Sequence, residues 1–79
     1  MSNLKPDTTL DCIGLYCPDT LFKTSEKMGN LQVGEVLEVL ADDPAAEEDI
    51  KSFVKHTGYE MLSFEKNDDQ LRFVIKKTK

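Results

Sequence analysis

The feature that most constrains the fold is the passage from a strand to a helix in residues 10–18, Leu-Asp-Cys-Ile-Gly-Leu-Tyr-Cys-Pro. Apolar and polar residues alternate over Thr8–Cys12, which predicts a strand. Gly14 then suits a tight turn, because glycine adopts positive φ without steric cost. Pro18 suits the first position of a helix, where its missing N–H would have no partner in any case. The sequence therefore predicts a helix from Pro18 to about Met28.

The rest of the chain predicts another strand, another helix and a hairpin. Branched apolar residues in Glu35–Ala41 indicate a strand. Asp43 and Pro44 are typical of a helix N-cap and first helical position, and Gly58 is typical of a helix end. Two final strands, joined by a short turn at Asn67-Asp68-Asp69, are expected at Tyr59–Lys66 and Gln70–Lys77.

Each predicted element has one apolar side. We expect these apolar sides to pack together and form the core of the protein. The residues expected to share a side are Leu10 and Cys12; Leu21, Phe22 and Met28; Ala46, Ile50, Phe53, Val54 and Thr57; Leu62 and Phe64; and Leu71, Phe73 and Ile75.

The element order β-α-β-α-β-β predicts an α/β two-layer sandwich. A strand-helix-strand unit forms a right-handed crossover between parallel strands. Both helices have a single apolar stripe, so we expect a four-stranded mixed sheet with the two helices on one face. Residues 1–7 are expected to form a flexible N-terminal tail, and residues 8–79 a single domain.

Charge and composition exclude several classes of function. The net charge is −5 and Arg72 is the only arginine, so direct binding of nucleic acid is not expected. No apolar run approaches the roughly 20 residues that cross a bilayer, and the polar N-terminus lacks the apolar region of a signal peptide. We therefore expect a cytoplasmic protein without membrane partners.

Cys17 is the candidate catalytic residue. At the N-cap of the first helix its sulfur would face unpaired backbone N–H groups and the positive end of the helix dipole, which favour the reactive thiolate. Pro18 fixes the helix start, and the amides of Asp19 and Thr20 are expected to form an anion cradle. In the preceding turn, Asp11 and Gly14 are expected to shape the backbone that presents Cys17.

Other residues that could carry chemistry have simpler interpretations. Cys12 alternates with Leu10 and is expected in the core, with a resolving partner for Cys17 as the alternative. His56 is expected at the surface near a helix end. The two cysteines and this histidine lack the spacing of a zinc site, so no metal is expected. Asp42 and Asp43 are expected to start the second helix.

Lys23 and Lys27 lie one turn apart on the first predicted helix. Such a pair is often only a solvated face. The two lysines could also help to dock an acidic partner protein near Cys17.

The chain resembles the TusA/SirA-like sulfur-carrier family over roughly residues 8–77. The resemblance rests on several segments that occur in the family's order and spacing. They are Leu10-Asp11-Cys12, Gly14-Leu15, Cys17-Pro18, Gly34-Glu35-Val36-Leu37, Ala41-Asp42-Asp43-Pro44-Ala45, Asp49-Ile50, Gly58-Tyr59-Glu60 and Phe73-Val74-Ile75-Lys76.

The resemblance implies a fold like the C-terminal domain of translation initiation factor three and a sulfurtransferase role. It implies that Cys17 accepts sulfane sulfur as a persulfide or thiosulfonate and passes it on. Donors in such a family are cysteine desulfurases or rhodanese-like proteins, and acceptor proteins act in tRNA thiolation or sulfur metabolism. No cofactor is implied, since the sulfur is the cargo.

One motif departs from the family. The usual Cys-Pro-X-Pro is here Cys17-Pro18-Asp19-Thr20, so Thr20 restores a backbone N–H that proline lacks. This departure leaves two other hypotheses open. One is a non-catalytic binding or regulatory module with the same fold, and the other is a small thiol redox protein that cycles between Cys12 and Cys17.

Overall fold

The structure is a computed structural model, and it describes residues 6–16 and 19–79. The expectations for residues 1–5 and for Cys17 and Pro18 lie outside the described residues. The helices and strands, in chain order, are β1 (Thr8–Cys12), α1 (Asp19–Asn30), β2 (Val36–Ala41), α2 (Ala45–Thr57), β3 (Glu60–Asn67) and β4 (Gln70–Lys76).

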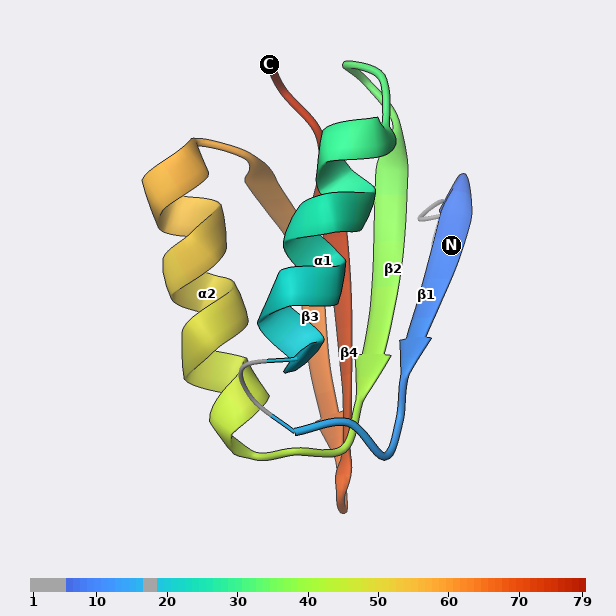
Figure 1. The fold of residues 1–79 in the computed structure, drawn as a ribbon, viewed down its shortest axis with the longest axis vertical. Coiled ribbons are helices and arrows are strands. Elements are labelled where there is room, and N and C mark those ends of the chain that lie inside the picture. Colours follow the sequence, from blue (N-terminus) through green and yellow to red (C-terminus); the bar gives the residue numbers. More distant parts are fainter. Residues whose placement is uncertain (1–5, 17–18) are drawn as a thin grey trace.

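The four strands form one mixed sheet in the order β1-β2-β4-β3. The β1–β2 pair is parallel, and the β2–β4 and β3–β4 pairs are antiparallel. Figure 1 shows α1 and α2 side by side on one face of this sheet. The predicted two-layer α/β fold is therefore confirmed.

The core lies between the helices and the covered face of the sheet. Cys12 and the alternating positions of β2 and β4 are buried there, including Leu71, Phe73 and Ile75 as predicted. From the helix side, α1 contributes Thr20, Thr24 and Met28, and α2 contributes Ala46, Ile50 and Val54.

Two predicted core positions are wrong. Phe22 is 65% exposed, because the buried stripe of α1 runs through Thr20, Thr24 and Met28 at intervals of one turn and leaves Phe22 on the outer side. In β3 a bulge between Met61 and Ser63 shifts the alternation, so that Met61 rather than Leu62 packs with Phe64 against the core.

The predicted helix ends differ from the observed ones by a residue or two. Helix α1 continues to Asn30, past the predicted end at Met28. Helix α2 begins at Ala45, and its N-cap is Pro44 rather than the predicted Asp43, without a capping hydrogen bond from the N-cap side chain. The Asp43 carboxylate, one residue earlier, accepts a hydrogen bond from the Ala45 N–H at 3.1 Å. At its other end Gly58, with φ 86°, donates its N–H to Val54 O. Such small shifts are usual at helix ends.

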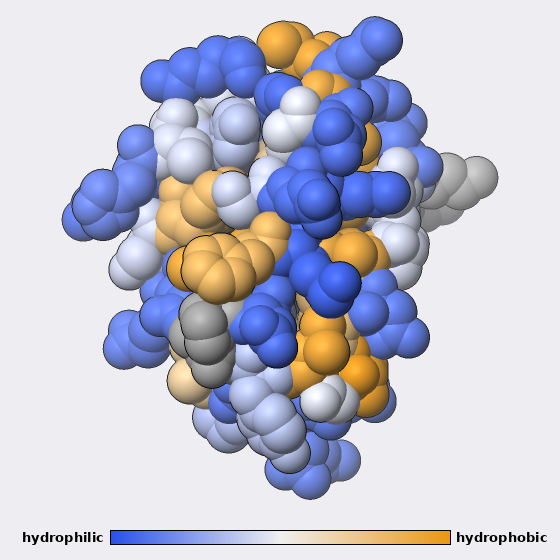
Figure 2. All heavy atoms as spheres, in the orientation of Figure 1, coloured by the Kyte–Doolittle hydropathy of each residue, from blue (hydrophilic) through white to orange (hydrophobic). Residues whose placement is uncertain are grey.

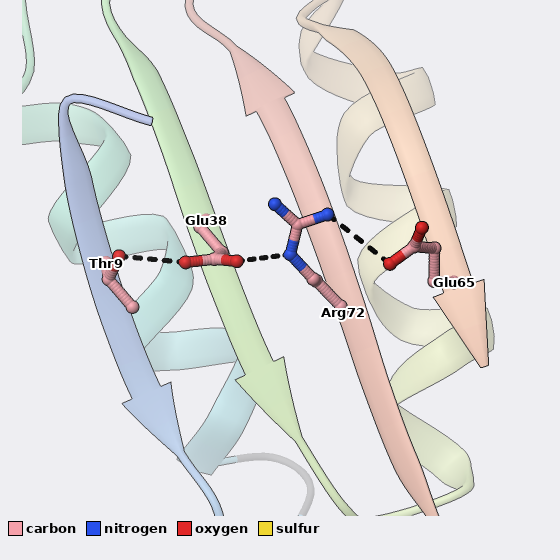
Figure 3. Close-up of polar contacts among 4 residues, drawn as sticks. All are labelled: Thr9, Glu38, Glu65 and Arg72. Atoms are coloured by element: carbon pink, nitrogen blue, oxygen red, sulfur yellow. Dashed lines mark hydrogen bonds and ion pairs between the residues drawn. The ribbon is translucent and has the colours of Figure 1, made fainter. Parts of the chain in front are cut away.

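The face of the sheet opposite the helices has a row of polar contacts that crosses all four strands (Figure 3). Glu38 of β2 accepts hydrogen bonds from Thr9 of β1 and from the Arg72 guanidinium of β4. Arg72 also forms an ion pair with Glu65 of β3 at 3.4 Å. The Arg72 guanidinium holds the pKa of Glu38 below its usual range.

Candidate functional site

The candidate site lies where β1 passes into α1. Cys17 and Pro18 lie outside the described residues, so the surrounding structure is given by the loop before them and by the first turn of α1 after them. Because β1 and β2 are parallel, their carboxyl ends meet at one edge of the sheet. Figure 1 shows the loop after β1 beside the loop after β2 at this edge.

Hydrogen bonds define the turn that follows β1. Asp11 Oδ1 accepts from the Ile13 N–H at 3.0 Å, and the Leu15 N–H donates to Cys12 O at 3.1 Å. Gly14 has φ 89°, in the left-handed region that favours glycine. These contacts direct the chain from the end of β1 toward the start of α1.

A residue of the neighbouring loop, which follows β2, also contacts this turn. Asp42 Oδ1 accepts a hydrogen bond from the Gly14 N–H at 2.9 Å. From the sequence, Asp42 was expected only at the start of the second helix, together with Asp43. The parallel pairing of β1 and β2 was the signal for this contact, because it places the residues after Cys12 and after Ala41 next to one another.

The first turn of α1 already uses one of the amides predicted for the anion cradle. The Asp19 N–H donates to Tyr16 O at 2.8 Å and closes the turn at the helix start. The Asp19 side chain is exposed, whereas Thr20 is almost completely buried. In this structure the Asp19 amide is therefore occupied within the chain.

Cys12 is a free thiol with no exposed surface, and it packs in the hydrophobic core. Its predicted core position is confirmed. Burial raises the pKa of the Cys12 thiol, as does the nearby Asp11 charge, while Lys23 opposes these effects. A buried thiol that holds its proton is a poor nucleophile, which disfavours Cys12 as a resolving partner.

The surface around this end of the molecule mixes apolar and charged side chains. Tyr16 is 73% exposed, and Ile13 and Phe22 are exposed as well. Lys23 is exposed and Lys27 half-buried on α1. Figure 2 shows the helix face, where apolar groups reach the surface between charged ones. A shallow hollow of about 330 Å³ on α1 is lined by Asp19, Phe22, Lys23 and Glu26.

Within residues 6–16 and 19–79, no three His, Cys, Asp or Glu side chains gather into a group that could hold a metal ion. His56 is exposed on α2, with Nδ1 2.8 Å from Ser52 O. Neither helix of the described chain is long and apolar enough to cross a membrane.

Comparison with known families decides the assignment. The profile of the family described as Sulfurtransferase TusA matches residues 8–77. The chain belongs to the TusA sulfurtransferase family. Membership in the TusA family supports a role as a sulfur carrier.

Relatives agree with the TusA assignment. A "Putative sulfur carrier protein" of Archaeoglobus fulgidus is 54% identical over 68 residues, which cover 85% of this chain and 88% of the relative. A protein with the same description from Aquifex aeolicus is 44% identical over 77 residues. That match covers 98% of this chain but 39% of the longer Aquifex protein.

A solved structure supports the fold of this TusA family member. The crystal structure of a SirA-like protein from Desulfitobacterium hafniense superposes with a TM-score of 0.79. The match covers 91% of this chain and 99% of the other, at 22% sequence identity.

Proposed function

We propose that this protein carries sulfane sulfur on Cys17 and relays it between a donor protein and an acceptor protein. The observation that most supports the proposal is the match of residues 8–77 to the TusA family, which spans the Cys17-Pro18 motif. A helix start next to the cysteine adds a physical reason, because the dipole and the backbone N–H groups there favour a thiolate.

The proposed transfer is a thiol–persulfide exchange. The Cys17 thiolate attacks the outer sulfur of a donor persulfide, so that a new S–S bond forms at Cys17 and the S–S bond of the donor breaks. The donor leaves as its own thiolate, and Cys17 holds a persulfide. The reverse exchange with an acceptor thiolate returns Cys17 to its starting state, so no external oxidant or reductant is consumed.

The proposed donor and acceptor classes are those that the resemblance to the sulfur-carrier family implies. We propose a cysteine desulfurase or a rhodanese-like protein as the donor, and an acceptor in tRNA thiolation or in sulfur metabolism, all in the cytoplasm. A thiosulfonate is the alternative cargo. The exposed Tyr16 and Phe22 and the cation of Lys23 lie near the start of α1, where a partner protein would have to approach.

A loading assay tests the proposal. The reduced protein is incubated with a cysteine desulfurase and cysteine, and its intact mass is recorded beside that of Cys17→Ser. Wild type is expected to gain one sulfur atom that dithiothreitol removes, and Cys17→Ser is expected to gain none. Equal loading of the two proteins, or no loading where another sulfur carrier is loaded, would refute the proposal.

A further inference from the structure

One edge of the sheet has a free backbone. β1 lies at the end of the strand order β1-β2-β4-β3 and pairs only with β2. Figure 1 shows β1 at the margin of the molecule, with no described helix or strand beyond it. The N–H and C=O groups of Thr8–Cys12 that point away from β2 therefore have no strand partner within residues 6–16 and 19–79. Such a row of groups is a template for one more strand.

The opposite edge of the sheet, at β3, is protected against pairing. A bulge between Met61 and Ser63 interrupts its ladder, and the charged Glu65 and Lys66 are exposed on this strand. Bulges and exposed charges are the usual means by which proteins prevent pairing at an edge. β1 pairs with β2 in an unbroken register and contains no proline or lysine. Of the two edges, β1 is therefore the one that is open to a further strand.

Two lysines of α1 lie beside this free edge. Lys23 and Lys27 are one turn apart, which places them on the same side of the helix. Lys23 is close enough to Cys12, the last residue of β1, for its charge to oppose the rise in the pKa of that thiol. Among the residues that the structure describes, no hydrogen bond or ion pair engages either ammonium group. The two cations are therefore available to a partner that approaches β1.

The charges favour a segment of another protein over a second copy of this chain. Side chains alternate along a strand, and Cys12 lies in the core, so Thr8, Leu10 and Cys12 face the helices. A second copy that continued the sheet with its helices on the same face would bring only these uncharged side chains toward the lysines. The acidic residue of β1, Asp11, faces the open side and already accepts a hydrogen bond from the Ile13 N–H.

We propose that the free edge of β1 binds an extended segment of a partner protein that carries acidic side chains at alternate positions. Backbone hydrogen bonds with β1 hold the segment, and its acidic side chains contact Lys23 and Lys27 on the helix face of the sheet. The inference rests on the proposed function only in taking a sulfur donor or acceptor protein as the source of the segment. It does not require that Cys17 carries sulfur.

Synthetic peptides test this mode of binding. The probe is acetyl-Thr-Glu-Val-Glu-Val-Glu-Thr-amide, and the control peptide has lysine in place of each glutamate. Each peptide is titrated into the isotope-labelled protein at neutral pH, and the backbone amide shifts are followed by NMR. The acidic peptide is expected to shift the amides of Thr8–Cys12 with saturation, and the lysine peptide is expected to bind about tenfold more weakly.

Two further comparisons separate the charges from the backbone. The double variant Lys23→Gln, Lys27→Gln is expected to bind the acidic peptide about tenfold more weakly. The matched control Lys55→Gln, Lys66→Gln, at exposed lysines of α2 and β3, should bind it as wild type does. N-methylation of the glutamates or of the valines blocks opposite edges of the extended peptide, because the N–H groups of a strand alternate in direction. Only one of these two methylated peptides is expected to lose binding.

The absence of saturable shifts in β1, equal binding of the two charged peptides, or equal effects of the two methylation patterns would overturn the inference. So would a dimer of the protein alone, measured by sedimentation, that dissociates as the peptide binds, because the occupant of the edge would then be a second copy. The peptides are added to the reduced protein without a sulfur donor, so their binding does not depend on sulfur transfer. Failure of the loading assay would refute the proposed function and leave this inference standing.

Discussion

At the scale of single residues, the loop before Cys17 is stabilised by a residue of a neighbouring loop. The Gly14 N–H is bonded to Asp42, which lies after β2. Asp11 and Gly14 were predicted for this turn from the sequence, but Asp42 was not, because two consecutive aspartates before a proline are explained by a helix start. Only the parallel pairing of β1 and β2 shows the second role.

Removal of the Asp42 acceptor tests this contact. Asp42→Ala is expected to lower the free energy of unfolding by about 1 kcal/mol, since the Gly14 N–H loses its partner. Asp42→Asn keeps an acceptor oxygen and should lose clearly less. Urea titrations followed by circular dichroism measure the difference, and equal losses in the two variants would contradict the assigned contact.

The backbone of the same turn gives a second prediction. Gly14 has φ 89°, where a side chain costs about 1 kcal/mol, so Gly14→Ala should destabilise the fold by that amount. Gly29 lies within α1, with open space around the position of a Cβ, and Gly29→Ala should stabilise the fold by about 0.5 kcal/mol. Thermal unfolding of both variants checks the opposite signs, and a shift in the same direction for both would count against this conformation of the turn.

At the scale of elements, the local sequence signals were sufficient where backbone conformation follows from residue type. The strand alternation, the prolines at the helix starts and Gly58 after α2 predicted all six elements to within about two residues. These signals failed where tertiary contacts determine which side chains are buried. Phe22 is exposed because Thr20 and Thr24 face the core. In β3 the bulge turns Met61 rather than Leu62 toward the core. Neither feature has a clear signature in one sequence.

The hydrogen bond between Asp43 and the start of α2 gives another prediction. Asp43 Oδ1 accepts from the Ala45 N–H, so Asp43→Ala should lower the free energy of unfolding by about 1 kcal/mol. Asp43→Asn is expected to retain most of the stability, because the asparagine side chain keeps an oxygen that can accept the same hydrogen bond. Chemical denaturation distinguishes the two. If Asp43→Ala were as stable as wild type, the contact would contribute nothing.

At the scale of the whole molecule, one row of polar side chains links all four strands on the face that the helices leave open (Figure 3). Arg72 lowers the pKa of Glu38 in the folded state. A lowered pKa means that the stabilisation is present above the usual range of a glutamate and is lost as pH falls through the folded-state pKa. The sheet is therefore expected to weaken in acid.

The variant Glu38→Gln isolates this contribution. Stability of the wild type is expected to fall by about 1 kcal/mol more than that of Glu38→Gln between neutral pH and pH values below the folded-state pKa of Glu38. Glu60→Gln, at an exposed position of β3, serves as the control and should follow the wild type. Denaturant titrations at each pH provide the measurement, and a parallel fall in all three proteins would exclude a role for the Glu38–Arg72 pair.

The most direct test of the account is the location of the transferred sulfur. After loading from a cysteine desulfurase, the peptide that contains Cys12 and Cys17 is fragmented between the two cysteines in a mass spectrometer. We predict one added sulfur atom on the fragment with Cys17 and none on the fragment with Cys12, which is buried in the core. Added sulfur on Cys12, or a bond between the two cysteines in place of added sulfur, would contradict the proposal that Cys17 is the carrier.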